Sequence, residues 1–98
     1  MEENKRRLYV LVDKSLEPVY GCVQGAHCVA EFLLTHPNQT WNNSYLIYLY
    51  ADVERYKEKL IRRNIDFSEF YEPDLGNKLT AIAVEGNDRL FRNLQLVA

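Results

Sequence analysis

The hydrophobic pattern in the first half of the chain predicts a buried strand followed by a long helix. Residues 8–12 read L-Y-V-L-V, a short apolar run with branched and aromatic side chains, which is typical of a strand buried on both faces. Pro18 suits the first turn of a helix, because proline lacks a backbone N–H that would need a partner. We therefore expect a central strand over 8–12 and a helix from Pro18 to about Thr35, ended by His36 and Pro37.

The spacing of side chains along this helix separates three faces. An apolar stripe at intervals of three and four residues is expected to face the core. It holds Val19, Cys22, Val23, Ala26, Ala30 and Leu33. A second stripe carries Tyr20, Gln24, His27 and Glu31. Gly21 and Gly25 leave a third strip almost without side chains, where another backbone or a ligand could approach closely.

The second half of the chain has the pattern of a sheet protein with short connections. The predicted elements are a strand over 45–50, a surface helix over 53–63, a strand over 67–71, a turn over 73–77, a strand over 79–84 and a short helix over 88–93. Because only a tight turn joins the last two strands, we expect them to pair antiparallel. The order β-α-β-α-β-β-α predicts an α/β fold with a mixed sheet covered by helices.

Length and charge limit what the chain can be. Its 98 residues allow one domain, residues 1–98, and 47% apolar with 27% charged residues is typical of a globular protein. Twelve Lys and Arg against fourteen Asp and Glu leave a net charge of −2, so a nucleic-acid partner would need a local basic patch. We expect a cytoplasmic protein without a membrane partner, because no apolar run reaches ~18 residues and the charged start lacks a signal-peptide pattern.

The residues with the clearest chemical potential are Gln24, His27 and Asp74. Ligands of α/β sheets bind off the carboxyl ends of strands, and this topology could bring segment 13–27 and the turn around Asp74 to one such edge. A histidine oriented by an amide or a carboxylate can activate water, and an aspartate can hold its tautomer. The alternative is structural, because a lone helical histidine often bonds a neighbouring backbone group and an aspartate often shapes its own turn.

Cysteine and metal chemistry are less favoured by the spacing. Cys22 and Cys28 would lie ~9 Å apart along a helix, too far for a disulfide, and are expected to be reduced, packed thiols. His27 points about 100° away from Cys28 around the helix and does not naturally activate it. His27 and His36 lie far apart along the helix, so no spacing supports a metal site and we predict no cofactor.

Several motifs, taken in order, resemble those of the type 2 peptidyl-tRNA hydrolase family. Residues 11–16, L-V-D-K-S-L, resemble the end of that family's first strand, and residues 23–28, V-Q-G-A-H-C, resemble its helix motif A-Q-C-S-H-A. Residues 73–76, P-D-L-G, resemble its D-A-G turn, and residues 79–86, L-T-A-I-A-V-E-G, its Q-T-V-L-G-I-G-P strand. The L-Q-L of residues 94–96 is similar to its L-K-L ending, so the resemblance covers nearly the whole chain.

The resemblance implies a three-layer α/β/α sandwich on a four-stranded mixed sheet, often paired as a homodimer, that cleaves the ester between a peptide and the ribose of tRNA. It implies that His27 and Asp74 position the water while Gln24 orients the substrate carbonyl. The candidate substrate contacts are Lys14, Tyr20, Lys78 and Thr80, with Arg62 and Arg63 as further contacts to phosphate.

The chain departs from the family pattern in two places. The family's G-K-G-K turn before the helix is replaced by E-P-V-Y at residues 17–20, which puts Tyr20 where a lysine would align. A phenol cannot replace an ammonium as a counter-charge at neutral pH. The family's loop after the D-A-G turn is reduced to Asn77 and Lys78. Three possibilities stay open: a carboxylic-ester hydrolase acting on peptidyl-tRNA, a catalytically impaired member that binds RNA or protein, and a structural role in which apolar strips such as the Gly21 and Gly25 side of the helix mark a self-association surface.

Overall fold

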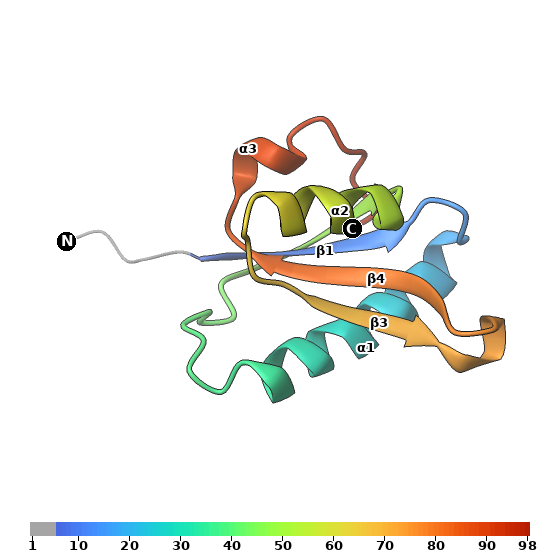
Figure 1. Ribbon diagram of the computed structural model, residues 1–98, viewed down its shortest axis with the longest axis horizontal. Helices are drawn as coiled ribbons and strands as arrows, with labels where there is room; N and C mark the ends of the chain where they lie inside the picture. The colour runs from blue at the N-terminus through green and yellow to red at the C-terminus, as the bar shows by residue number, and fades with distance from the viewer. Residues whose placement is uncertain (1–5) are drawn as a thin grey trace.

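The computed structural model describes residues 6–98 and confirms the predicted order of elements (Figure 1). The strands are β1 (Arg7–Asp13), β2 (Tyr45–Ala51), β3 (Ser68–Glu72) and β4 (Lys78–Glu85). The helices are α1 (Pro18–Thr35), α2 (Val53–Arg62), the 3₁₀ turn η1 (Pro73–Leu75) and α3 (Asp88–Phe91).

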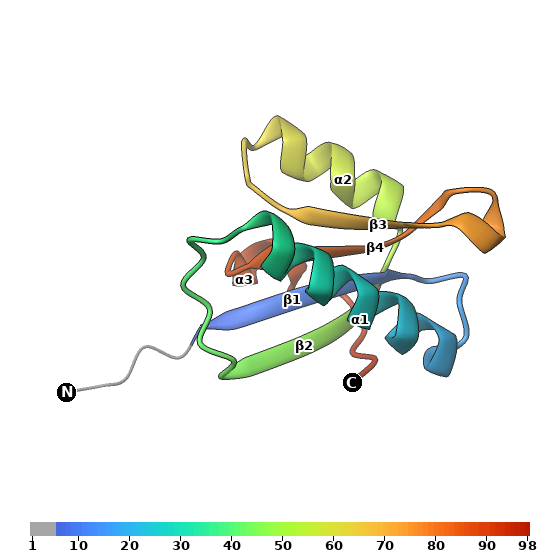
Figure 2. The ribbon, with the colours of Figure 1, turned by 90° about the horizontal axis from the view of Figure 1, so that it is seen from below.

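The four strands form one mixed sheet in the order β2-β1-β4-β3. β1 pairs parallel with β2, and α1 supplies the crossover that a parallel pair needs. β1 pairs antiparallel with β4, and β3 pairs antiparallel with β4 as the short turn between them predicts. α1 covers one face of the sheet, whereas α2 and α3 cover the other (Figures 1 and 2). The predicted three-layer α/β/α sandwich is therefore confirmed.

β1 lies inside the sheet and is buried on both faces, as its unbroken apolar run predicts. Leu8, Val10 and Val12 pack in the core beneath α1. Tyr9 and Leu11 pack in the core on the other side, with Phe91 of α3. Because alternate side chains of a strand point to opposite faces, this one strand contributes to both cores.

The prediction of which face α1 buries is wrong. The apolar stripe that was expected to face the core is turned to solvent, with Val19 72% exposed and Leu33 45% exposed. The buried face instead carries Gly21, Gln24, Gly25, Cys28 and Phe32.

Although the outer face of α1 is apolar, no helix within residues 6–98 has the length and hydropathy needed to cross a membrane.

Two glycines explain how α1 packs on the sheet. A Cβ at Gly25 would lie 2.4 Å from Cε2 of Tyr48 and 3.0 Å from Cγ1 of Val10, closer than packed side chains tolerate. At Gly21 the nearest atom would be Cγ2 of Val12 at 3.4 Å, an ordinary contact. The strip without side chains therefore admits side chains of β1 and β2, rather than a ligand or another backbone.

The last residues of the chain cover the outer edge of β2. The backbone N–H of Tyr48 donates to the carbonyl of Ala98, and the N–H of Val97 donates to the carbonyl of Tyr48, both at 2.8 Å. The N–H of Tyr50 donates to the carbonyl of Gln95 at 2.9 Å. These bonds satisfy backbone groups that an open edge strand would leave unpaired, and they hold Gln95 beside the end of β2.

The two thiols should differ in reactivity. Both cysteines are free, as predicted, but Cys28 is buried between α1 and the sheet, whereas Cys22 is half-buried. Burial, together with the charges of Glu31 and Glu69, raises the pKa of the Cys28 thiol to about 12, so almost no reactive thiolate forms there near pH 8. Titration with a disulfide reagent should label Cys22 first and label Cys28 only after denaturant is added. Equal labelling rates in the folded protein would contradict the packing of α1.

Candidate functional site

The segments predicted to meet at one edge of the sheet lie together there. β1 and β3 both end at this edge, where the loop 14–17 leads into α1 and η1 leads toward β4 (Figure 2). Nζ of Lys78 donates to Oγ of Ser15 at 2.9 Å, which ties the two connections together. We call this region, made of the loop 14–17, residues 18–27 of α1 and residues 72–78, the η1 end.

Gln24 lies at the centre of the η1 end and is held by protein groups on both sides. The residue is 1% exposed. Its Nε2 donates to Oε1 of Glu72 at 2.8 Å, and its Oε1 accepts from Oγ1 of the fully buried Thr80 at 2.6 Å. Gln24 and Thr80 were predicted to contact substrate, but both are buried: Thr80 bonds Gln24, and Gln24 bonds Glu72.

Glu72 is the functional candidate that the sequence analysis missed. It ends β3 and caps η1, because its Oε2 accepts the backbone N–H of Asp74 at 3.0 Å. This hydrogen bond, the one from Gln24 and the charge of His27 hold the pKa of Glu72 below its ordinary value, against a smaller effect of desolvation. The available signal was an acidic residue directly before a Pro-Asp turn, at the end of a strand. The structure thus fixes an ionised carboxylate at this edge.

Glu72 should give the protein an acid-sensitive part of its stability. An unfolded glutamate has a pKa of about 4.3, and the pKa of Glu72 in the folded protein is lower. The contribution of Glu72 to the free energy of unfolding is therefore complete above about pH 4.3, and it is lost as the pH falls through the pKa of Glu72 in the folded protein. Denaturant unfolding between about pH 7 and pH 3 should show that wild type loses stability more steeply than Glu72→Gln below about pH 4.3. If the stability of wild type and of Glu72→Gln fell equally with pH, the result would contradict a carboxylate held by Gln24 and the η1 turn.

His27 lies exposed on α1, with its ring against Phe70 of β3. The two ring centroids are 4.7 Å apart and the ring planes differ by 8°, so the rings stack face to face. Stacking of this kind restricts the orientation of the imidazole. Because the charge of His27 affects the pKa of Glu72, the two groups are within electrostatic reach. The η1 end therefore combines an accessible imidazole with a fixed carboxylate.

Asp74 and Tyr20 complete this end. Asp74 is exposed in η1, and its carboxylate forms no hydrogen bond within residues 6–98, so it does not hold the tautomer of His27 here. Partial burial, followed by the charges of Glu72 and Asp74, raises the pKa of the Tyr20 phenol. Tyr20 therefore stays a hydrogen-bond donor at neutral pH. Across residues 6–98, no three His, Cys, Asp or Glu side chains form a group that could hold a metal.

The basic residues predicted to contact substrate do not lie together in the structure. Nζ of Lys78 lies 3.5 Å from Oδ2 of Asp13, so its charge is largely neutralised within the protein. Lys14 is exposed and forms no ion pair with any described residue of the chain. Arg62 and Arg63 lie exposed at the far end of α2. Only Lys14 therefore offers an unpaired positive charge close to the η1 end.

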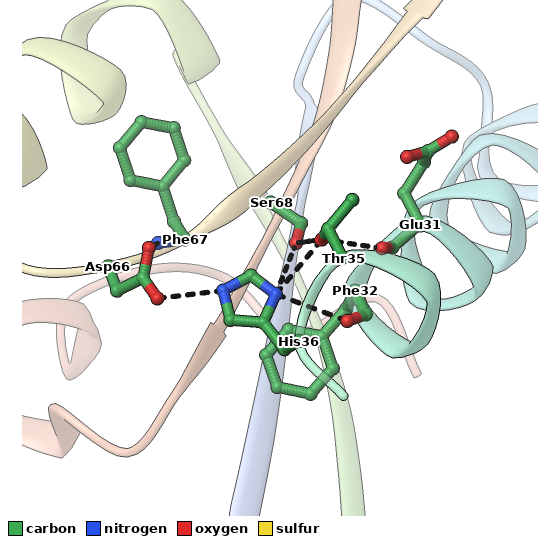
Figure 3. Close-up of polar contacts among 7 residues, drawn as sticks. All are labelled: Glu31, Phe32, Thr35, His36, Asp66, Phe67 and Ser68. Atoms are coloured by element: carbon green, nitrogen blue, oxygen red, sulfur yellow. Dashed lines mark hydrogen bonds and ion pairs between the residues drawn. The ribbon is translucent and has the colours of Figure 1, made fainter. Parts of the chain in front are cut away.

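A second polar cluster surrounds His36 at the opposite end of the sheet (Figure 3). Nε2 of His36 lies 2.8 Å from Oδ2 of Asp66, and Nδ1 lies 2.9 Å from Oγ1 of Thr35 and 3.3 Å from Oγ of Ser68. The imidazole also stacks on Phe32, with ring centroids 4.7 Å apart. This cluster was not predicted from the sequence, because its members come from three separate segments: the end of α1, the segment before β3 and β3 itself.

The cluster contains the groups of a nucleophilic triad: Asp66, His36 and a hydroxyl. Their surroundings indicate a structural role instead. A nucleophile needs a hydroxyl that faces the substrate and gives its proton to the imidazole. Ser68 is 5% exposed, and the Thr35 hydroxyl donates to the carbonyl of Glu31 at 2.7 Å. A cavity of about 490 Å³ opens beside His36 and Asp66, but neither hydroxyl lines it. We therefore place the candidate chemistry at the η1 end.

The fold defines the class of the protein: a three-layer α/β/α sandwich on a four-stranded mixed sheet. No family model matches the chain, and no curated protein matches it. A solved structure of a protein of unknown function from Agrobacterium tumefaciens strain C58 is similar to it, with a TM-score of 0.69 over 98% of this chain and 100% of that chain. The two sequences are 12% identical, so the similarity establishes the fold alone.

Proposed function

We propose that the protein is a small hydrolase that cleaves the carboxylic ester joining a peptide to the ribose of tRNA. The observation that supports this function best is the placement of the accessible His27 beside the fixed carboxylate of Glu72 at one edge of the sheet. The motifs shared with the type 2 peptidyl-tRNA hydrolases suggest the substrate.

In the proposed reaction, His27 takes a proton from water as the water oxygen attacks the ester carbonyl carbon. The negative charge of Glu72 favours the imidazolium that forms. Tyr20, which stays protonated, donates a hydrogen bond to the oxyanion of the tetrahedral intermediate, and Asp74 orients the attacking water. Collapse of the intermediate breaks the bond to the ribose oxygen, which receives the proton from His27. Gln24 and Thr80 keep Glu72 in place.

A second function is favoured by the charge of the same region. Glu72 and Asp74 put two carboxylates at the η1 end, and Tyr20 supplies no positive charge where the family has a lysine. This negative charge repels the phosphates of a tRNA whose ester lies at the η1 end, so it disfavours catalysis there and leaves RNA or protein binding to other parts of the surface. Under this alternative, the chain is a catalytically impaired member of the family and binds RNA or a protein partner without turnover.

Homodimer formation stays a prediction for either function. The exposed face of α1 includes Val19 and Val23, and with Val97 it lines an apolar groove of about 410 Å³. A second copy of the chain could bury this surface, because large exposed apolar patches often mark association sites.

Incubating the full chain with a labelled peptidyl-tRNA separates the two functions. The hydrolase predicts release of the peptide over many turnovers. The binding module predicts that tRNA is retained without release, with an affinity that falls as salt is added if the contacts are to phosphate. A matched substrate with an amide in place of the ester is the control and should resist an esterase. If peptide release does not exceed that in buffer, the hydrolase proposal is wrong.

A further inference from the structure

A second cavity lies near the carboxyl ends of the parallel strands β1 and β2. It has a volume of about 360 Å³ and is bounded by residues 52–59, at and within α2, and by Leu94 and Gln95. The backbone N–H of Lys14 donates to the carbonyl of Ala51 at 2.9 Å, which places Lys14 where both strands end. Ligands of α/β sheets gather at such strand ends.

Three cations line this cavity: Lys14, Arg55 and Lys59. Within residues 6–98, none of them forms an ion pair with a carboxylate, whereas Lys57 lies 3.0 Å from Glu69. Arg55 and Lys59 are four residues apart on α2, a spacing at which like charges repel each other and destabilise a helix. The lining holds one carboxylate, Asp52, against these three cations, so an excess of positive charge remains that an anion from outside the protein can balance.

The remaining walls suit a ligand that is larger than a simple anion. Tyr56 lines the cavity and is half-buried, and Nζ of Lys59 lies 4.6 Å from the centroid of its ring. Tyr50 also borders the cavity, but it packs against the core beneath α1. Aromatic rings beside cations can stack a base while the cations hold its phosphate. Asp52, the one acidic residue in the lining, caps α2 by accepting the N–H of Arg55 at 3.4 Å, and its charge offsets one of the three cations.

We propose that this cavity binds a phosphate group of a nucleotide, through Lys14, Arg55 and Lys59. The inference rests on the proposed function only in naming RNA as the molecule that carries the phosphate. The η1 end is acidic, whereas a tRNA ester bound there needs a cationic contact for its phosphate nearby. The cations of this cavity would supply that contact. The phosphate would then be held on the α2 side of the sheet, and the ester would reach His27 on the α1 side.

The test uses the full chain and measures binding of a fluorescent single-stranded RNA by anisotropy. The test variant carries Arg55→Gln with Lys59→Gln. The control carries Arg89→Gln with Arg92→Gln, which removes the same charge from two exposed residues in and beside α3. The test variant should bind about tenfold more weakly at low salt, and the slope of log affinity against log salt should become shallower by about 0.7, the contribution of one phosphate contact on a single strand. AMP should compete better than adenosine does.

The outcomes separate this inference from the hydrolase proposal. Equal weakening in the test and control variants, no RNA binding by wild type, or equal competition by adenosine and AMP would each overturn the phosphate site. If wild type binds RNA through these residues but releases no peptide, the site stands and the hydrolase proposal fails. If wild type hydrolyses peptidyl-tRNA and the test variant keeps the same KM, the hydrolase proposal stands and the phosphate site fails.

Discussion

Replacing Gly25 with alanine is expected to destabilise the fold by about 1–3 kcal/mol, the usual effect of overpacking a core, although alanine is the better helix former. The added methyl group would lie 2.4 Å from Cε2 and 2.9 Å from Cζ of Tyr48, and 3.0 Å from Cγ1 of Val10. Tyr48 is 9% exposed and Val10 is fully buried, so neither side chain has room to retreat. Denaturant unfolding should show a lower midpoint with an unchanged slope.

Gly21→Ala is the matched control for this experiment. It makes the same chemical change one turn earlier on the same face of α1, but its nearest neighbour would be Cγ2 of Val12 at 3.4 Å. The higher helix propensity of alanine should then dominate, with an effect between neutral and about 1 kcal/mol of added stability. A loss of the same size in both variants would contradict the view that close approach at Gly25 sets the position of α1.

Replacing His27 with alanine is expected to lower the rate of peptide release from peptidyl-tRNA by about 10² to 10⁴-fold, the usual effect of a positioned acid-base group. The side chain is exposed, so its removal should leave the fold intact, apart from the stacking on Phe70. The measurement is the initial rate of release at saturating substrate, with circular dichroism to verify folding.

His36→Gln is the control for the His27 variant. It removes the chain's other histidine, which lies at the opposite end of the sheet and ties α1 to Asp66. We expect His36→Gln to affect stability, because the contact between His36 and Asp66 is lost. The rate of peptide release per folded molecule should stay unchanged. Equal loss of activity in both histidine variants would contradict the placement of the chemistry at the η1 end.

The sheet was predictable from the sequence because its signals are local. An unbroken apolar run such as residues 8–12 predicts a strand buried on both faces, and a five-residue connection such as 73–77 forces the strands that flank it to pair antiparallel. The face of α1 was not predictable from hydrophobic spacing. Gly21 and Gly25 bring α1 close to the sheet without adding any apolar side chain to the pattern, and Gln24 is a polar residue within the buried face.

The candidate site was predicted in part. The sequence placed Gln24, His27 and Asp74 at one edge, and the structure brings the segments that carry them together. It could not show that Glu72, rather than Asp74, contacts Gln24, because the two acids are two residues apart and only the geometry of η1 separates them. The cluster around His36 was missed for a similar reason, since Asp66 lies 30 residues away along the chain.

We propose that the η1 end catalyses hydrolysis of the ester in peptidyl-tRNA. The most direct measurement compares peptide release by wild type with release by the double variant His27→Ala, Asp74→Ala, on the same labelled substrate and with both proteins shown to be folded. We predict that wild type releases the peptide at least about 10²-fold faster, because the double variant lacks both groups that act on the water. Equal release by the two proteins would contradict the claim.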